Sequence, residues 1–138
     1  MGAQGYKDLK VFQKAYAVAM KVFEISKSFP AGEKYSLTDQ VRRSSRSVSV
    51  NIGEVYRKRI YPKHFVSKLS DSDGEGTETM IFLDFAKDCG YLTEEQHKQL
   101  IEDYTQIGKM LGSMMLSPEK FSPREKEGNS PLPTATAD

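Results

Sequence analysis

Residues 35–61, YSLTDQVRRSSRSVSVNIGEVYRKRIY, decide the fold of this chain. Within them, apolar and small residues recur at alternating spacings of four and three, which places these residues on one face of a single long helix. The stripe consists of Val41, Ser45, Val48, Ile52 and Val55. Because β-branched residues and serine are mediocre helix formers, packing against other helices must hold this helix in place.

Three further segments carry an amphipathic pattern, and Pro30, Pro62 and Gly90 mark the breaks between the patterns. Proline disfavours a helical residue before it, and glycine supplies the left-handed conformation that ends many helices. We expect helices at about residues 8–28, 36–60, 62–89 and 93–116. Four such helices joined by short loops predict an all-α fold, an antiparallel up-down-up-down four-helix bundle.

Local signals sharpen the expected helix ends. Ser36 stands at the N-cap position of the second helix, and Thr93 with Gln96 makes a capping-box pattern at the start of the fourth. The third helix carries small residues, Ser72, Gly76 and Thr79, where a larger residue would be usual. We expect them to lie against the serine-rich face of the second helix.

The chain of 138 residues is long enough for one domain with a real core. The expected organisation is a short N-terminal arm at 1–7, the bundle at 8–117 and a disordered tail at 118–138, which is rich in proline, serine and charge. One cysteine, no apolar run of about 20 residues and no signal-like start indicate a cytoplasmic protein with no membrane contact.

Charge is sorted along the sequence, although the formal total is only +1. Residues 40–68 hold eight Lys or Arg and one acid, whereas residues 69–103 hold ten acids and two lysines. Such sorting creates a strong local field. The candidate nucleic-acid-binding residues are the eight cations of the first block: Arg42, Arg43, Arg46, Arg57, Lys58, Arg59, Lys63 and Lys68.

Each charged cluster has a second interpretation. Arg57, Lys58 and Arg59 can contact phosphates, or they can complement the negative end of the helix dipole. The acidic patch of the third helix can form a solvated face or salt bridges to Arg42, Arg43 and Arg46 of the second helix. It consists of Asp71, Asp73, Glu75 and Glu78.

Catalytic chemistry finds little support in the sequence. Glu94 and His97 make the only Glu-x-x-His match, whereas a di-metal bundle needs two. Cys89 lacks a histidine nearby in the sequence, and we interpret it as a packing residue. The sequence therefore predicts no enzyme, no metal and no cofactor.

Several separated motifs resemble one family. They are LKVFQK at residues 9–14, SVSVNIGE at 47–54, LDFA at 83–86 and CGYL at 89–92. Over roughly residues 6–116 the chain is similar to the bacterial four-helix-bundle proteins encoded within intervening sequences of 23S ribosomal RNA genes. One departure is Val55, which stands where the family signature usually has glycine.

The resemblance implies a left-handed antiparallel bundle. Relatives that include the accessory protein of diversity-generating retroelements form homopentamers, and that relative binds nucleic acid and a reverse transcriptase through a basic surface. The resemblance therefore implies that Arg42, Arg43 and Arg46 form most of such a surface, extended by the cations at 57–59. It also implies a structural role, a polar link between helices, for the signature residues Asn51 and Glu54.

Two hypotheses for function follow. The first is a non-enzymatic, oligomeric bundle that binds structured RNA or DNA through phosphates. The second is an assembly or adaptor protein that binds another protein and has no direct role with nucleic acid. Head-to-tail contacts between the two charge blocks of neighbouring subunits would use up the arginines and so favour the second hypothesis.

Overall fold

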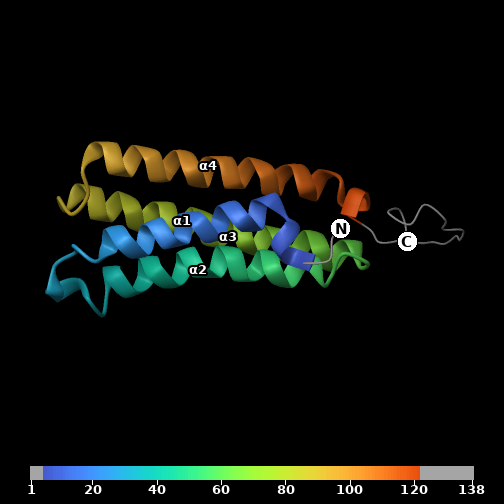
Figure 1. Cartoon of the computed structure of the whole chain (residues 1–138), viewed down its shortest axis with the longest axis horizontal. Helices are drawn as coiled ribbons and strands as arrows, with labels where there is room; N and C mark the ends of the chain where they lie inside the picture. The colour runs from blue at the N-terminus through green and yellow to red at the C-terminus, as the bar shows by residue number, and fades with distance from the viewer. Residues whose placement is uncertain (1–4, 122–138) are drawn as a thin grey trace, which may run out of the picture.

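A computed structural model describes residues 5–121 of the chain, and within this range it contains helices and no strand (Figure 1). The predicted all-α four-helix bundle is confirmed, while its left-handed twist stays a prediction. The four long helices are joined by short connections and accompanied by three 3-10 helices. In chain order the elements are η1 (Gly5–Asp8), α1 (Lys10–Ser26), η2 (Ala31–Glu33), α2 (Leu37–Tyr56), α3 (Pro62–Asp88), α4 (Glu94–Leu116) and η3 (Pro118–Phe121).

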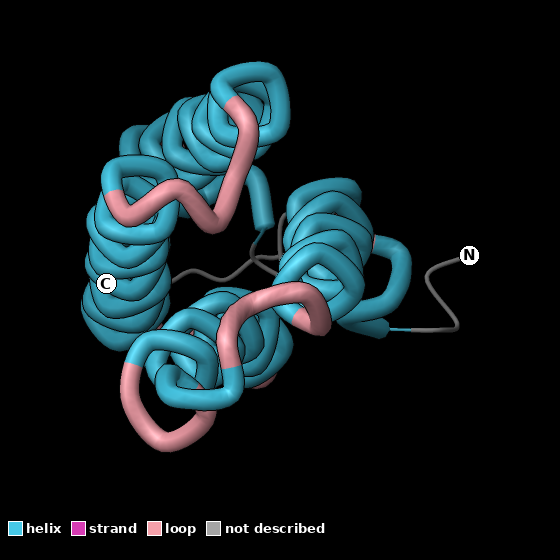
Figure 2. The backbone as a smooth tube through the Cα atoms, turned by 90° about the vertical axis from the view of Figure 1, so that its left-hand side faces the viewer, coloured by secondary structure: helices cyan, strands magenta, loops and turns pink. Residues whose placement is uncertain are grey.

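Neighbouring helices run antiparallel around the bundle. Late α2 faces early α3, where Ser72 Oγ donates to the carbonyl of Val48 at 2.9 Å. Early α2 faces late α3, where Thr79 Oγ1 donates to Ser44 Oγ at 2.8 Å. α2 and α3 have the most extensive contact, whereas α1 and α4 touch each other less than the other neighbouring pairs do. The view along the bundle shows the wider gap between those two backbones (Figure 2).

The hydroxyl-rich face of α2 is buried, as its stripe predicts. Val41, Val48, Ile52 and Val55 are fully buried in the core, and Ser44, Ser45 and Ser49 are buried beside them. Ser72 and Thr79 of α3 lie against this face through the two hydrogen bonds just described. Gly76 differs from the expectation: it lies beside Tyr104 of α4, where an added Cβ would be 3.9 Å from the ring.

Two of the predicted helix ends are confirmed. Thr93 Oγ1 accepts from the Gln96 N–H at 3.0 Å, and the Gln96 side chain accepts from the Thr93 N–H at 2.9 Å. Gly90 has a φ of 83°, and the N–H of Tyr91 donates to the carbonyl of Ala86 at 2.8 Å. A left-handed residue followed by a bond back to the last turn is the usual glycine-terminated helix end.

The expected N-cap of α2 is at the predicted residue, but a different side chain makes the capping hydrogen bond. Ser36 occupies the N-cap position, but its hydroxyl makes no cap hydrogen bond. The carboxylate of Glu33 takes this role instead, because Glu33 Oε1 accepts from the Leu37 N–H at 3.3 Å and from Ser36 Oγ at 2.7 Å. The same carboxylate accepts from the Tyr91 hydroxyl at 2.9 Å and so joins the two connections at this end of the bundle.

Two helices are shorter than predicted. α1 ends at Ser26 instead of residue 28, and the next three N–H groups bond to carbonyls three residues back. α2 ends at Tyr56 instead of residue 60, where the same tight pattern begins at Arg57. The side chain of Arg59 turns back there and donates to the carbonyl of Tyr56 at 2.8 Å. These bonds satisfy the last carbonyls and end the helix.

The predicted arm and tail are each wrong in part. Residues 5–7 belong to η1, which the Gln13 side chain holds by donating to the carbonyl of Lys7 at 2.7 Å. Residues 118–121 form η3 because Phe121 stacks on the buried ring of Phe65, with 5.6 Å between the ring centroids. The rest of the predicted arm and tail, 1–4 and 122–138, lies outside the described residues.

Candidate nucleic-acid interface

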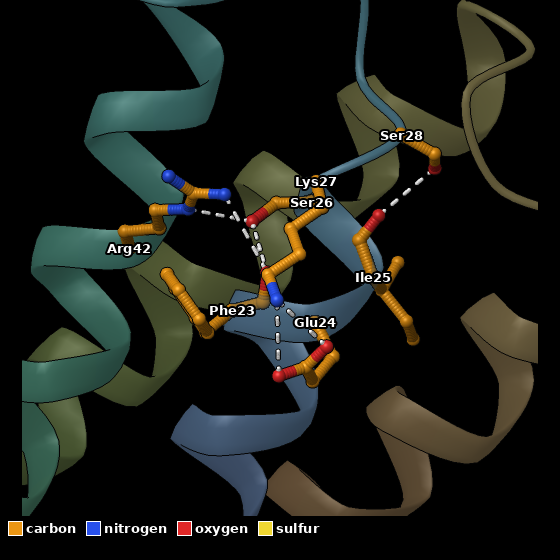
Figure 3. A network of polar contacts seen from close by, with 7 residues as sticks. All are labelled: Phe23, Glu24, Ile25, Ser26, Lys27, Ser28 and Arg42. Atoms are coloured by element: carbon orange, nitrogen blue, oxygen red, sulfur yellow. Dashed lines mark hydrogen bonds and ion pairs between the residues drawn. The ribbon is translucent and has the colours of Figure 1, made fainter.

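Arg42 of α2 contacts the last turn of α1 and links the two helices (Figure 3). Its Nε donates to Ser26 Oγ at 2.7 Å and its Nη2 donates to the carbonyl of Phe23 at 3.5 Å. The guanidinium also lies over the Phe23 ring, 4.8 Å from the centroid. A cation at the last carbonyls of α1 complements the negative end of that helix. This arginine therefore belongs to the α1–α2 contact.

Arg43 and Arg46 extend from α2 towards solvent. The Arg43 side chain is 76% exposed, and its nearest acid, Asp39, is 3.9 Å away one turn earlier. Arg46 is exposed and lies at the edge of the Phe23 ring, 5.8 Å from the centroid. A weak pair at the surface contributes little to stability, so both side chains are free to contact an anionic partner.

The cations after α2 also divide into two kinds. Arg57, Lys58 and Lys63 are exposed, and within residues 5–121 their side chains make neither a hydrogen bond nor an ion pair. Arg59 is partly buried, because its guanidinium lies 3.9 Å from the centroid of the Tyr56 ring and bonds to the backbone there. The interpretation as simple dipole complementation therefore fits Arg59, which contacts a terminal carbonyl, better than it fits its neighbours.

Lys68 links the family-signature residues of α2 to α3. Its Nζ donates to Asn51 Oδ1 at 3.1 Å and pairs with Glu54 Oε1 at 2.7 Å. Asn51 and Glu54 thus lie one turn apart on α2 and share a single lysine from α3. This arrangement favours a structural role for all three residues.

Sequence reasoning missed several lysines that the fold brings to the same end of the bundle as residues 57–63. They are Lys7, Lys10, Lys109 and Lys120, which come from the start of the described chain and from its end. Lys10, Lys109 and Phe121 line one groove of about 450 Å³, which shows that these distant segments meet. The predicted topology could have revealed this cluster, because an up-down bundle places the start of its first helix beside the end of its fourth.

The acidic face of α3 does not pair with the arginines of α2 as one interpretation proposed. Within residues 5–121, no ion pair joins Arg42, Arg43 or Arg46 to an acid of α3. Arg43 does share a shallow groove with Glu75 and Glu78. Burial raises the pKa of Glu75, the neighbouring carboxylates of Glu78 and Asp71 raise it further, and Arg43 lowers it. Repulsion among the acids is thus only partly relieved.

The described residues can also be compared with the requirements of a metal site, a reactive cysteine and a membrane-spanning helix. Between residues 5 and 121 no group of three or more His, Cys, Asp or Glu is placed to hold a metal ion. His97 Nε2 lies 2.7 Å from Asp84 Oδ1, which ties α4 to α3. Cys89 is exposed, so the packing role expected for it is wrong: it follows the last residue of α3, where the chain turns outward. None of the described helices has the length and apolar character to cross a bilayer.

The fold and the charge pattern define a small helical bundle with a basic surface. A family model described as 23S rRNA-intervening sequence protein matches residues 7–113, so the chain belongs to this family. Among solved structures, it is similar to a protein of unknown function from the S23 ribosomal protein family of Bacteroides thetaiotaomicron. The two are 27% identical with a TM-score of 0.70, over 77% of this chain and 95% of that chain. No curated protein matches the sequence.

Proposed function

We propose that this protein is a non-enzymatic, homo-oligomeric bundle that binds structured RNA or DNA through phosphate contacts in the cytoplasm. The observation that carries the proposal is a set of exposed cations with little or no acidic partner in the described part of the chain: Arg43, Arg46, Arg57, Lys58 and Lys63. Cations of this kind displace the counterions condensed on a nucleic acid, which favours binding at low salt. The description of the family names 23S rRNA, and a nucleic-acid partner agrees with that description.

Exposed apolar side chains support the oligomeric part of the proposal. Tyr16 and Met20 of α1 are about half exposed, as are Ile81 and Phe85 of α3. The first pair lies on a helix rich in lysine and the second among acids, so opposite charges accompany the two apolar pairs. The homopentamer implied by the family resemblance would use contacts of this type.

The same acidic and apolar strip of α3 favours the second candidate function, an adaptor that binds another protein. Ile81 and Phe85 lie one turn apart, and Glu78, Asp84 and Asp88 surround them. A basic, amphipathic segment of a partner fits this strip by charge and by apolar contact. Such a partner would leave the exposed cations of α2 without a role.

Fluorescence anisotropy with a labelled RNA hairpin and a labelled DNA duplex, measured across a salt series, tests the first function. We expect affinity that falls steeply with salt and that Arg43→Gln with Arg46→Gln reduces. Arg42 is left intact, because its loss would disturb the α1–α2 contact. A folded oligomer that binds neither probe at low salt would contradict the proposal and favour the adaptor.

A further inference from the structure

One end of the bundle gathers cations from three separate segments of the chain. This basic end comprises residues 5–10, 54–64 and 109–121, which hold eight Lys or Arg and three acids. The opposite end, residues 24–42 and 81–98, holds seven acids and five cations. Figure 1 shows η1, the turn between α2 and α3, and η3 together at the basic end. The net charge of the bundle is therefore positive at one end and negative at the other.

Contacts fix the segments of the basic end against one another. Gly5 of η1 lies beside the Tyr56 ring, which an added Cβ would meet at 3.6 Å. Phe121 of η3 stacks on Phe65 in the first turn of α3. These contacts therefore hold the three segments, with the cations that they carry, at the same end of the bundle.

An exposed aromatic side chain lies among these cations in the sequence. Tyr61 is 54% exposed and the adjacent Ile60 is 51% exposed, in the turn between Lys58 and Lys63. The Tyr61 and His64 rings meet in a T-shaped arrangement, with 6.0 Å between their centroids. More than half of this tyrosine is thus open to solvent.

We infer that the basic end binds an unpaired run of nucleotides, with Tyr61 stacking on a base and the surrounding Lys and Arg contacting phosphates. This inference rests on the proposed function and names the form of nucleic acid that the protein takes. Base stacking on an exposed aromatic ring needs bases that are already unstacked, as in loops and single strands. A duplex keeps its bases inside and offers this surface only its phosphates, so Tyr61 adds nothing there.

The test measures anisotropy of the full-length protein with a labelled single-stranded oligonucleotide about 12 nucleotides long, as RNA and as DNA, beside a duplex of equal length. Tyr61→Leu is expected to weaken single-strand affinity at least about five-fold and to leave duplex affinity unchanged. Tyr61→Phe keeps the ring and should restore binding. The matched control is Tyr35→Leu, which removes an 85% exposed tyrosine beside Lys34 at the opposite end.

A charge series provides the second arm. Lys58→Gln with Lys63→Gln should lower the slope of log affinity against log salt by about 1.4 for a single strand. Lys27→Gln with Lys34→Gln removes the same charge at the opposite end and should change the slope little. Single-strand binding that ignores Tyr61→Leu, or that responds equally to both lysine pairs, would overturn the inference alone. Failure of the wild type to bind any probe would overturn the proposed function with it.

Discussion

The two ends of the bundle use their charges in different ways. At the end where α1 joins α2, Arg42 and Glu33 both have partners inside the chain, and these partners close the connections between helices. At the basic end, Arg57, Lys58 and Lys63 have no such partner within residues 5–121. Arg42 and Arg57 belong to one basic run in the sequence, so charge density alone does not reveal which cation is structural.

Replacing Arg42 should have the largest effect on stability. Arg42→Ala removes two charge-assisted hydrogen bonds and the contact with the Phe23 ring, and it leaves the carbonyl of Phe23 without this donor. We expect the free energy of unfolding to fall by about 1–3 kcal/mol, because hydrogen bonds to charged groups lie near this range. Urea denaturation followed by circular dichroism measures the change.

The neighbouring residue is the matched control for this substitution. Arg43→Ala removes a side chain that is 76% exposed and weakly paired, so stability should stay within about 0.5 kcal/mol of the wild type. Equal losses for Arg42→Ala and Arg43→Ala would show that the two arginines do not differ as the geometry requires.

This contrast also shows what the sequence could and could not predict. The spacing of Val41, Val48 and Ile52 predicts the helix, its buried face and, with the other stripes, the bundle. The partner of Arg42 depends on how far α1 and α2 slide past each other, which places Ser26 and Phe23 beside it. Periodicity on one helix contains no information about that offset.

The basic end could have been predicted from the sequence, but its cations come from segments that are far apart along the chain. Lys10 and Lys109 are 99 positions apart, and a count of charge along the chain keeps them separate. The predicted up-down topology already placed the start of the first helix beside the end of the fourth. Arg59 was harder to assign, since its contact with Tyr56 depends on α2 ending earlier than its periodicity suggests.

The pH dependence of stability tests the role of Glu33 at the end of the bundle where α1 joins α2. Its hydrogen bonds from Ser36 and Tyr91 lower the pKa of this carboxyl below the ordinary value of 4.5 in the folded protein. A group with a lowered folded pKa stabilises the fold above the unfolded pKa, and that contribution disappears as pH falls through the folded pKa. Glu33→Gln should therefore lose stability at pH 7, by less than Arg42→Ala does.

The difference between Glu33→Gln and the wild type should shrink as pH falls below about 4.5, the unfolded value. Thermal unfolding at a series of pH values between neutral and acid measures it. A difference that stays constant over this range would mean that the ionised carboxylate does not tie the connections together.

Lys68 is an intermediate case between a structural and a free cation. Lys68→Met keeps much of the apolar stem and removes the contacts with Asn51 and Glu54. Because Lys68 is 31% exposed and Glu54 is 54% exposed, the expected loss is small, about 0.5–1 kcal/mol by urea denaturation. Glu54→Gln leaves the bond to Asn51 in place and should cost less. A larger cost for Glu54→Gln would place the main role on the carboxylate.

The smallest effect on stability, with the opposite sign, is expected at the basic end. Lys58→Gln with Lys63→Gln removes two exposed cations, one from the turn after α2 that also holds Arg57 and Arg59, and one from the first turn of α3. Like charges repel across this short distance, so their removal should raise the free energy of unfolding by up to about 0.5 kcal/mol at low salt.

Salt separates this explanation from a gain in helix propensity. Screening at about 1 M ionic strength shortens the Debye length to about 3 Å, and the gain of the Lys58→Gln with Lys63→Gln variant should disappear there. A gain that survives high salt would come from the glutamines themselves, and a loss at low salt would mean that these lysines have partners in the fold. Either result would remove the contrast between the two ends, because the basic end would no longer hold mutually repelling charges that an anionic partner could relieve.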